Sequence, residues 1–197
     1  MNTARLRQSV LLTVAVGSVA LMLACGSSGA ETGAGTDRKA VERVIDATKV
    51  LSIDDLVAAG LKKSKSYDVA GLPGATDAWL GFFGPNPAAR KDYELRFYPS
   101  HEAAVRDGTA LADEGVGEGM RAKKDSQTWP EGQKDRWFAG GVTDVSSPGS
   151  RQAPGPRYWD YVIYGNVIML CQGADSTQSL ETCSALVQAL GGPDLLK

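Results

Sequence analysis

The sequence predicts an α+β domain in which helices pack on one face of an antiparallel sheet of about five strands. Runs rich in aromatic and β-branched residues occur in adjacent pairs, and each pair is followed by an amphipathic helix pattern. This strand-strand-helix order occurs twice, after two shorter helix patterns near the N-terminus. We place the domain at residues 37–197, a length that suits a single hydrophobic core.

Two helices are expected at the start of the domain. The first, at 37–51, carries β-branched residues at helical spacing. The second, at 52–60, begins with Ser52 and Asp55 in the pattern of a capping box. A basic cluster follows at 62–65, which we interpret as a solvated loop. Contact with anionic lipid headgroups is the alternative.

The first strand pair is expected at 78–83 and 93–98. The second of these strands alternates, which places Glu94 and Arg96 on the exposed face of a half-buried strand. A helix should follow at 101–114, because a proline ends the strand and a serine can cap the helix.

Little periodicity is found between the two halves of the domain. Residues 115–131 should form a mobile surface segment, and 136–143 is a candidate strand weakened by two glycines. A loop rich in Ser, Pro and Gly is expected at 146–156.

The second strand pair gives the strongest strand signal in the chain. Residues 158–164 and 167–171 are separated by Gly165-Asn166, which is typical of a tight hairpin turn. The last helix should begin at Asp175. Strand 158–164 has apolar side chains on both faces, which leaves open a sheet covered on both sides.

The N-terminal end of the chain predicts export. Arg5 and Arg7 precede an uncharged stretch at 10–24 that ends in small residues, so residues 1–24 should be a signal peptide. The stretch is shorter than the roughly 17–25 residues that a membrane-spanning helix needs.

The end of this signal, Leu23-Ala24-Cys25, resembles the lipobox of bacterial lipoproteins. The resemblance implies that Cys25 is lipidated and becomes the first residue of the mature chain. The protein would then be anchored on the extracytoplasmic face of the cell membrane, with the Gly/Ser-rich residues 25–36 as a flexible tether. An ordinary signal peptide cleaved near Ala24, with an incidental cysteine, is the alternative.

A second resemblance covers most of the mature chain. The stretch from Glu94 to Ala104, with the preceding Gly71 to Thr76, is similar to uncharacterised domains on exported bacterial lipoproteins. The resemblance implies export, and it transfers no activity and no site residues.

Cysteine usage fits an oxidising compartment. If Cys25 is lipidated, Cys171 and Cys183 are the remaining pair, and we expect a disulfide between them. Two buried free thiols are the alternative.

Composition argues against several classes of function. The signal holds two of the 21 basic residues and none of the 23 acidic ones, so the mature chain carries 19 against 23, or −4. This balance disfavours nucleic-acid binding. His101 is the one histidine, which excludes a metal site with several histidines, and no nucleophile elbow or phosphate-binding loop is present. We therefore expect no metal and no cofactor.

These observations favour a non-catalytic module that binds an envelope protein, a glycan or a small molecule. Trp79, Arg96 and Trp159 are the candidate contact residues, together with the irregular segment 115–131. The strand aromatics could instead belong to the core. The alternative function is a cell-surface hydrolase whose carboxylates come together only in the fold.

Overall fold

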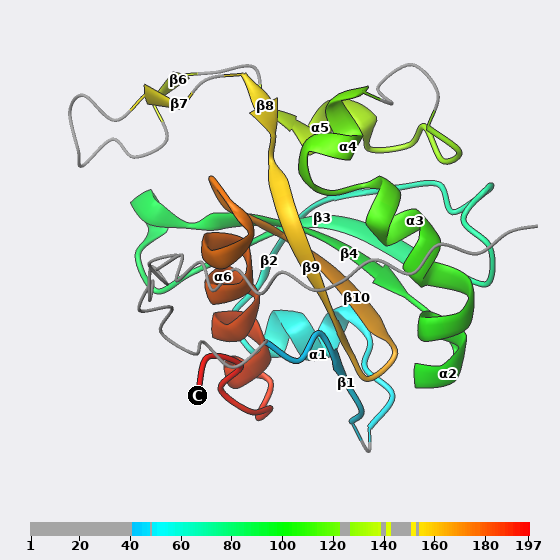
Figure 1. Cartoon of the computed structure of the whole chain (residues 1–197). Coiled ribbons are helices and arrows are strands. Elements are labelled where there is room, and N and C mark those ends of the chain that lie inside the picture. The colour runs from blue at the N-terminus through cyan, green and yellow to red at the C-terminus, as the bar shows by residue number, and fades with distance from the viewer. Residues whose placement is uncertain (1–40, 48, 123–126, 139–140, 143–150, 153) are drawn as a thin grey trace, which may run out of the picture. The chain divides into compact units, whose positions relative to one another are not determined.

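The structure is a computed structural model, and it describes residues 41–47, 49–122, 127–138, 141–142, 151–152 and 154–197 (Figure 1). The expected signal peptide, Cys25 and the tether lie outside these residues, as do parts of the expected helix at 37–51 and of the loop at 146–156. Across the part of the chain that is described, no helix combines the length and apolar character needed to cross a bilayer.

A six-stranded sheet organises the described residues, with the strand order β1, β9, β10, β4, β3, β2 (Figure 1). These strands are β1 (Val44–Ile45), β2 (Lys62–Ser66), β3 (Asp77–Phe83), β4 (Lys91–Phe97), β9 (Tyr158–Tyr164) and β10 (Val167–Gln172). Neighbours are antiparallel except β1 and β9, which are parallel. The α+β class is confirmed, whereas the expected five antiparallel strands are wrong in number and in one orientation.

Both predicted strand pairs are present. In the first, Trp79 of β3 lies opposite Leu95 of β4. In the second, Val167 lies opposite Tyr164 across the predicted turn. Gly165 has a φ of 54°, which a residue without a Cβ adopts readily.

The expected helix at 37–51 is wrong where the structure describes it, because Val44 and Ile45 form β1. Strand β9 offers an unpaired edge there. Its Ile163 backbone N–H donates to the carbonyl of Arg43 at 2.7 Å, and the Gly165 N–H donates to Ile45 at 2.9 Å. Val44 is 42% exposed while Ile45 packs against the core, which is the alternation of a strand. Pairing with a distant strand therefore overrides local spacing that also fits a helix.

Of the next two elements, the predicted helix is confirmed and the predicted loop is wrong. Helix α1 (Ile53–Ala58) has the predicted capping box, in which Ser52 and Asp55 satisfy each other's backbone N–H groups. The expected loop at 62–65 is instead the edge strand β2, whose five residues are all exposed. Its lysines suit an edge position, because charged side chains there oppose pairing with another chain.

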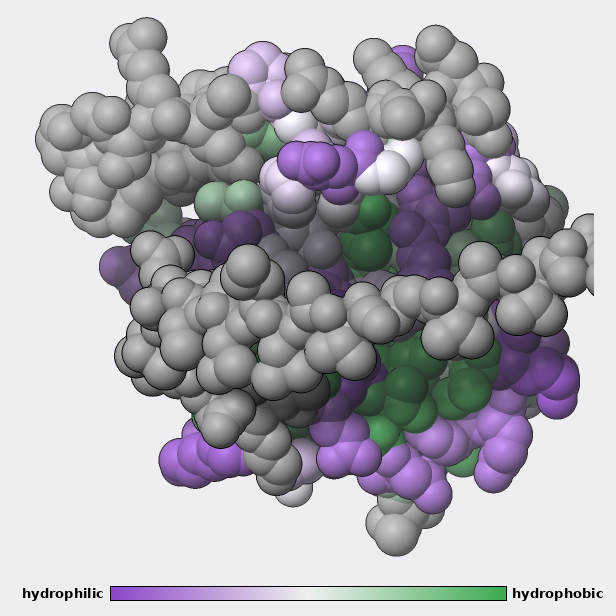
Figure 2. All heavy atoms as spheres, viewed as in Figure 1, coloured by the Kyte–Doolittle hydropathy of each residue, from purple (hydrophilic) through white to green (hydrophobic). Residues whose placement is uncertain are grey.

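Helices cover both faces of the sheet, so the expected one-sided arrangement is wrong. Helix α6 (Ser176–Ala189) packs on the first face, over a cluster that includes Leu95, Val162 and Met169. The helical stretch from α2 (His101–Ala103) through η2 (Ala104–Gly108) to α3 (Thr109–Glu114) packs on the second. Figure 1 shows these helices on opposite sides of the central strands, and Figure 2 shows hydrophobic side chains gathered between the β9–β10 hairpin and the α2–α3 stretch.

Helices cover both faces of the sheet because its central strands carry apolar side chains on both faces. Successive side chains of β10 point to opposite faces, and they are apolar on both: Met169 belongs to the α6 cluster, while Ile168 and Leu170 belong to the α2–α3 cluster. A strand that is apolar on both faces needs packing partners on both.

Several shorter elements connect these parts. They are η1 (Pro87–Ala89), α4 (Gly117–Ala122), α5 (Gln133–Arg136), β5 (Trp137–Phe138), β6 (Gly141–Val142), β7 (Arg151–Gln152) and β8 (Gly155–Pro156). Strand β5 pairs with β8, and β6 pairs with β7. The candidate strand at 136–143 is therefore two short strands with different partners.

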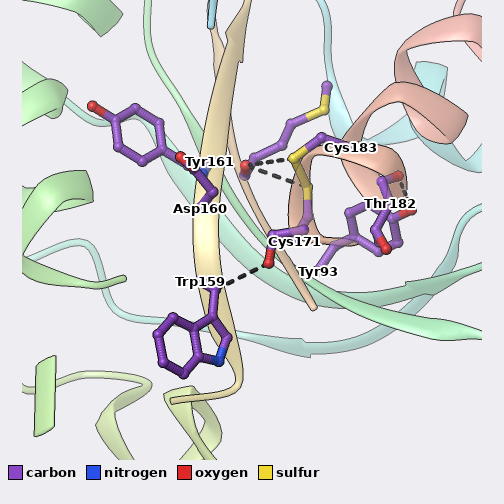
Figure 3. The surroundings of a disulfide bond; sticks show 9 residues. Tyr93, Trp159, Asp160, Tyr161, Cys171, Thr182 and Cys183 are labelled. Carbon is purple, nitrogen blue, oxygen red and sulfur yellow. Dashed lines mark hydrogen bonds between the residues drawn. A yellow bond between two sulfur atoms is a disulfide. The ribbon is translucent and has the colours of Figure 1, made fainter. Parts of the chain in front are cut away.

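The predicted disulfide between Cys171 and Cys183 is present (Figure 3). It joins β10 to α6, with a Cα–Cα distance of 5.5 Å. Beside it, the Tyr93 hydroxyl donates to the Thr182 carbonyl at 2.7 Å. Helix α6 is thus fixed to the sheet by a covalent bond and a buried hydrogen bond.

Candidate functional site

Two buried arginines share one buried carboxylate on the α2–α3 side of the sheet. Glu94 and Arg96 lie two residues apart on β4 and so project to the same face. Arg96 donates to Glu94 Oε1 from Nε at 2.8 Å and from Nη2 at 2.7 Å. Arg136, from α5, donates from Nε to Glu94 Oε2 at 2.7 Å. All three side chains are nearly inaccessible, with at most 2% exposed.

Trp129 completes this group, which we call the arginine cluster (Glu94, Arg96, Trp129 and Arg136). The guanidinium carbons of Arg96 and Arg136 lie 5.1 and 4.6 Å from the centre of its indole ring, within the range of cation–π attraction. The indole N–H donates to the Asp68 carbonyl at 3.0 Å. The tryptophan is therefore held from both its ring face and its polar edge.

Arg136 also forms hydrogen bonds with the segment that precedes α5. Its Nη1 donates to the Gln127 side-chain carbonyl at 2.8 Å and to the Trp129 backbone carbonyl at 3.2 Å, while Nη2 donates to the Glu131 carbonyl at 2.6 Å. The sequence predicted a mobile surface segment at 115–131. Where this segment is described, it instead includes α4 and the buried Trp129, and residues 123–126 lie outside the description.

A small cavity adjoins the arginine cluster. Its volume of about 10 Å³ has room for about one water molecule. Gly115 forms part of the wall, and a Cβ at this position would lie 3.0 Å from Arg96 Nη2. The cavity is lined by Arg96, Leu111, Glu114, Gly115, Gln127, Trp129 and Arg136.

Two hydrogen-bond donors of the cavity wall have no partner among the described residues. They are Arg96 Nη1 and the Gln127 side-chain nitrogen, and both atoms are buried. Buried donors are nearly always paired with protein or ordered water in folded proteins, so two at one cavity call for an acceptor there, which a water molecule or a ligand atom can supply.

The electrostatics of the cluster favour an anion as that acceptor. Two guanidinium groups share the single carboxylate of Glu94, which leaves one positive charge in excess among the buried side chains. Burial lowers the pKa of Arg96, and the charge of Glu94 opposes that effect. Arginine still remains protonated in proteins, so the cluster can hold a negative group but is poorly suited to proton transfer.

Of the three predicted contact residues, only Arg96 lines the cavity. The sequence placed it on an exposed strand face, whereas the structure leaves 1% of it exposed, because the α2–α3 side of the sheet is covered. It does meet the predicted segment 115–131, through Gly115, Gln127 and Trp129.

Trp79 and Trp159 lie elsewhere. Trp79 packs against the α6-side core, its indole N–H donates to Asp77 at 2.6 Å, and the Lys63 ammonium lies 5.3 Å from its ring centre. Trp159 is the second residue of β9, and its backbone N–H donates to the Ser179 hydroxyl at 3.1 Å. In Figure 3 its ring points away from the disulfide. Neither tryptophan borders the cavity, and both are half-buried.

Sequence reasoning missed Glu94, Trp129 and Arg136 as members of the site. One signal was available: opposite charges two residues apart on a strand flanked by apolar residues suggest a buried pair. Arg136 gave no such signal, because its partner is 42 residues away in the chain.

His101 does not join this cluster. Its Nδ1 lies 2.8 Å from the Gly165 carbonyl, where it links the start of α2 to the β9–β10 turn. Within the described residues, no group of three or more His, Cys, Asp or Glu side chains is placed to hold a metal ion.

Comparison with known proteins places most of the chain in one family. Residues 52–192 match a family of unknown function (DUF6810). No curated protein matches the chain, and no solved structure matches it.

Proposed function

The chain belongs to the DUF6810 family, whose function is unknown, and from its sequence and the geometry of its domain we propose that it is a lipid-anchored extracytoplasmic protein whose domain binds a ligand without catalysis. The ligand site is the cavity beside the arginine cluster. The ligand is a small molecule or a group on an envelope partner.

The proposed address rests on the N-terminal sequence. A basic start, an uncharged stretch and Leu23-Ala24-Cys25 occur in the order of a lipoprotein signal. A single acyl chain holds a protein only marginally, while two or more hold it stably, so a diacylglycerol on Cys25 would suffice as an anchor. The disulfide between Cys171 and Cys183 supports an oxidising compartment.

The proposed binding role rests on one observation, the two buried donors without partners at the cavity. A core that serves packing alone gains nothing from leaving Arg96 Nη1 and the Gln127 nitrogen unpaired, because each such group costs about 1–3 kcal/mol. A ligand that accepts from both would remove this cost on binding. Both carboxylate oxygens of Glu94 accept from arginines and the side chain is inaccessible, so it is poorly placed to act as a general acid or base.

The test is site-specific photocrosslinking of the full-length chain in its native membrane. A photoreactive residue replaces Thr128, which is exposed and lies between the cavity residues Gln127 and Trp129. The matched control carries the same residue at Val57, which is exposed on α1. We expect an adduct from position 128 that is absent from position 57.

A second variant, Leu111→Phe, adds volume to the half-buried cavity wall. It should remove the adduct at position 128 while the unfolding temperature stays near that of the wild type. In parallel, Cys25→Ser should release the chain from the membrane fraction. Identical adducts at positions 128 and 57 would refute the binding site, and turnover of an envelope substrate would support the hydrolase alternative instead.

A further inference from the structure

We infer that the group entering the cavity beside the arginine cluster is a single carboxylate. This inference rests on the proposed function, since it names the chemistry of that site's ligand. It is carried by the donors, the charge and the size of the cavity.

The donors match a group with two acceptor atoms. Arg96 Nη1 and the Gln127 side-chain nitrogen come from β4 and from the segment before α5, and neither has a partner among the described residues. The remaining guanidinium nitrogens of both arginines already donate to Glu94, Gln127 or backbone carbonyls. A carboxylate has two oxygens and can accept from both free donors at once.

The charge favours a monoanion. Among the buried side chains, Glu94 offsets one of the two arginines and leaves a single positive charge, which the half-buried carboxylate of Glu114 on the cavity wall reduces in part. A cation would add to that charge. A phosphate dianion would exceed it and would need more donors than the cavity offers.

The size of the cavity also favours a carboxylate. About 10 Å³ has room for about one water-sized atom, such as one carboxylate oxygen, which disfavours entry of a tetrahedral phosphate or sulfate. Leu111 and Trp129 supply an apolar wall against which the adjoining carbon can rest.

Glu114 sets the strength of binding. Its carboxylate lines the cavity, is half-buried, and accepts from the Thr128 backbone N–H at 2.6 Å. A bound carboxylate would meet this like charge at close range. Glu114 therefore weakens the site, and its neutralisation should strengthen binding.

The experiment measures acetate binding to the full chain purified in detergent. Sodium acetate replaces sodium chloride at constant ionic strength, and the Gln127 side-chain amide and the Trp129 indole N–H are followed by NMR. We expect saturable shifts of both signals with acetate. A response that does not distinguish acetate from chloride would overturn the carboxylate assignment, as would tighter binding of inorganic phosphate or sulfate.

Isosteric variants then test the donors. Gln127→Glu keeps the oxygen that accepts from Arg136 and removes the free N–H donor, so it should lower acetate affinity about 10- to 100-fold. Glu114→Gln should raise the affinity. The matched control is Gln188→Glu on the exposed side of α6, which makes the same charge change and should leave the affinity unaltered. Equal effects of Gln127→Glu and Gln188→Glu would overturn the inference.

A short peptide with a free C-terminus, compared with the same peptide carrying a C-terminal amide, distinguishes the two sources of the carboxylate, which are the chain end of a partner and a small acid. Tighter binding of the free peptide than of acetate identifies a chain end of a partner, and equal or weaker binding identifies a small acid. Should acetate fail while position 128 still gives its specific adduct, the binding site stands and the carboxylate assignment falls.

Discussion

The two faces of the sheet are built on the same central strands, yet they satisfy their polar groups in different ways. On the α6 side, the core is apolar, a disulfide joins helix to strand, and the Tyr93 hydroxyl has a partner. On the α2–α3 side, a charged cluster is buried, and the hydroxyls of Tyr98 and Tyr158 are buried without a partner among the described residues.

This difference indicates that one face of the sheet mainly stabilises the domain and the other carries the candidate site. The α6 side has what stability requires, namely covalent closure, apolar packing and paired polar groups. The α2–α3 side keeps charges and unpaired donors that reduce stability unless a ligand uses them. Functional sites commonly carry such local costs.

The largest expected effect comes from breaking the arginine cluster. Glu94→Gln leaves two buried guanidinium groups without a counter-charge, so the free energy of unfolding should fall by about 3–5 kcal/mol. Urea unfolding measures this. Glu181→Gln, on the exposed side of α6, is the control and should change stability by less than about 0.5 kcal/mol. A loss below about 1 kcal/mol in Glu94→Gln would show that the charges are not buried as described.

A somewhat smaller effect is expected from the opposite face. Replacing Cys171 and Cys183 together by Ala removes a crosslink that spans 12 residues, which should lower the free energy of unfolding by roughly 3 kcal/mol. Acetate binding at the arginine cluster should survive in this variant below its unfolding transition. Loss of binding from the folded variant would contradict the separation of the two faces.

The smallest expected changes in stability come from two substitutions, one on each face of the sheet. Tyr93→Phe removes a buried hydrogen bond to the Thr182 carbonyl and should cost about 1 kcal/mol. Tyr158→Phe removes a fully buried hydroxyl without a described partner, so the cost of that unpaired group is lost and the free energy of unfolding should rise by about 1 kcal/mol. Thermal unfolding of both variants measures the contrast. A clear loss in Tyr158→Phe would show that its hydroxyl is paired.

Features set by local chemistry were predictable from the sequence. The capping box at Ser52, the hairpin turn at Gly165-Asn166 and the start of α6 after Asp175 each depend on residues within a few positions of one another. The disulfide was predictable because few cysteines leave few pairings.

Features that depend on distant partners were not predictable. Strand β1 has two residues, and it forms because β9 presents an open edge more than 100 residues later in the chain. Strand β2 lacks the alternation that marks a half-buried strand, since all five of its residues are exposed. Arg96 was predicted as a contact residue, but its neighbour Arg136 is brought to it only by the folded chain.

Strand β2 has a consequence for proteins packed densely on a surface. It ends the sheet, and Lys62, Lys63 and Lys65 supply three ammonium groups along its five residues. Two copies that approached edge to edge would bring six such groups into one seam, four of them paired with Asp54 or Asp135 of their own chain, and the remaining repulsion would oppose backbone pairing. If lipid anchors confine many copies to two dimensions, this edge keeps neighbouring sheets from joining into a fibril, and concentrated salt would weaken that protection by screening it.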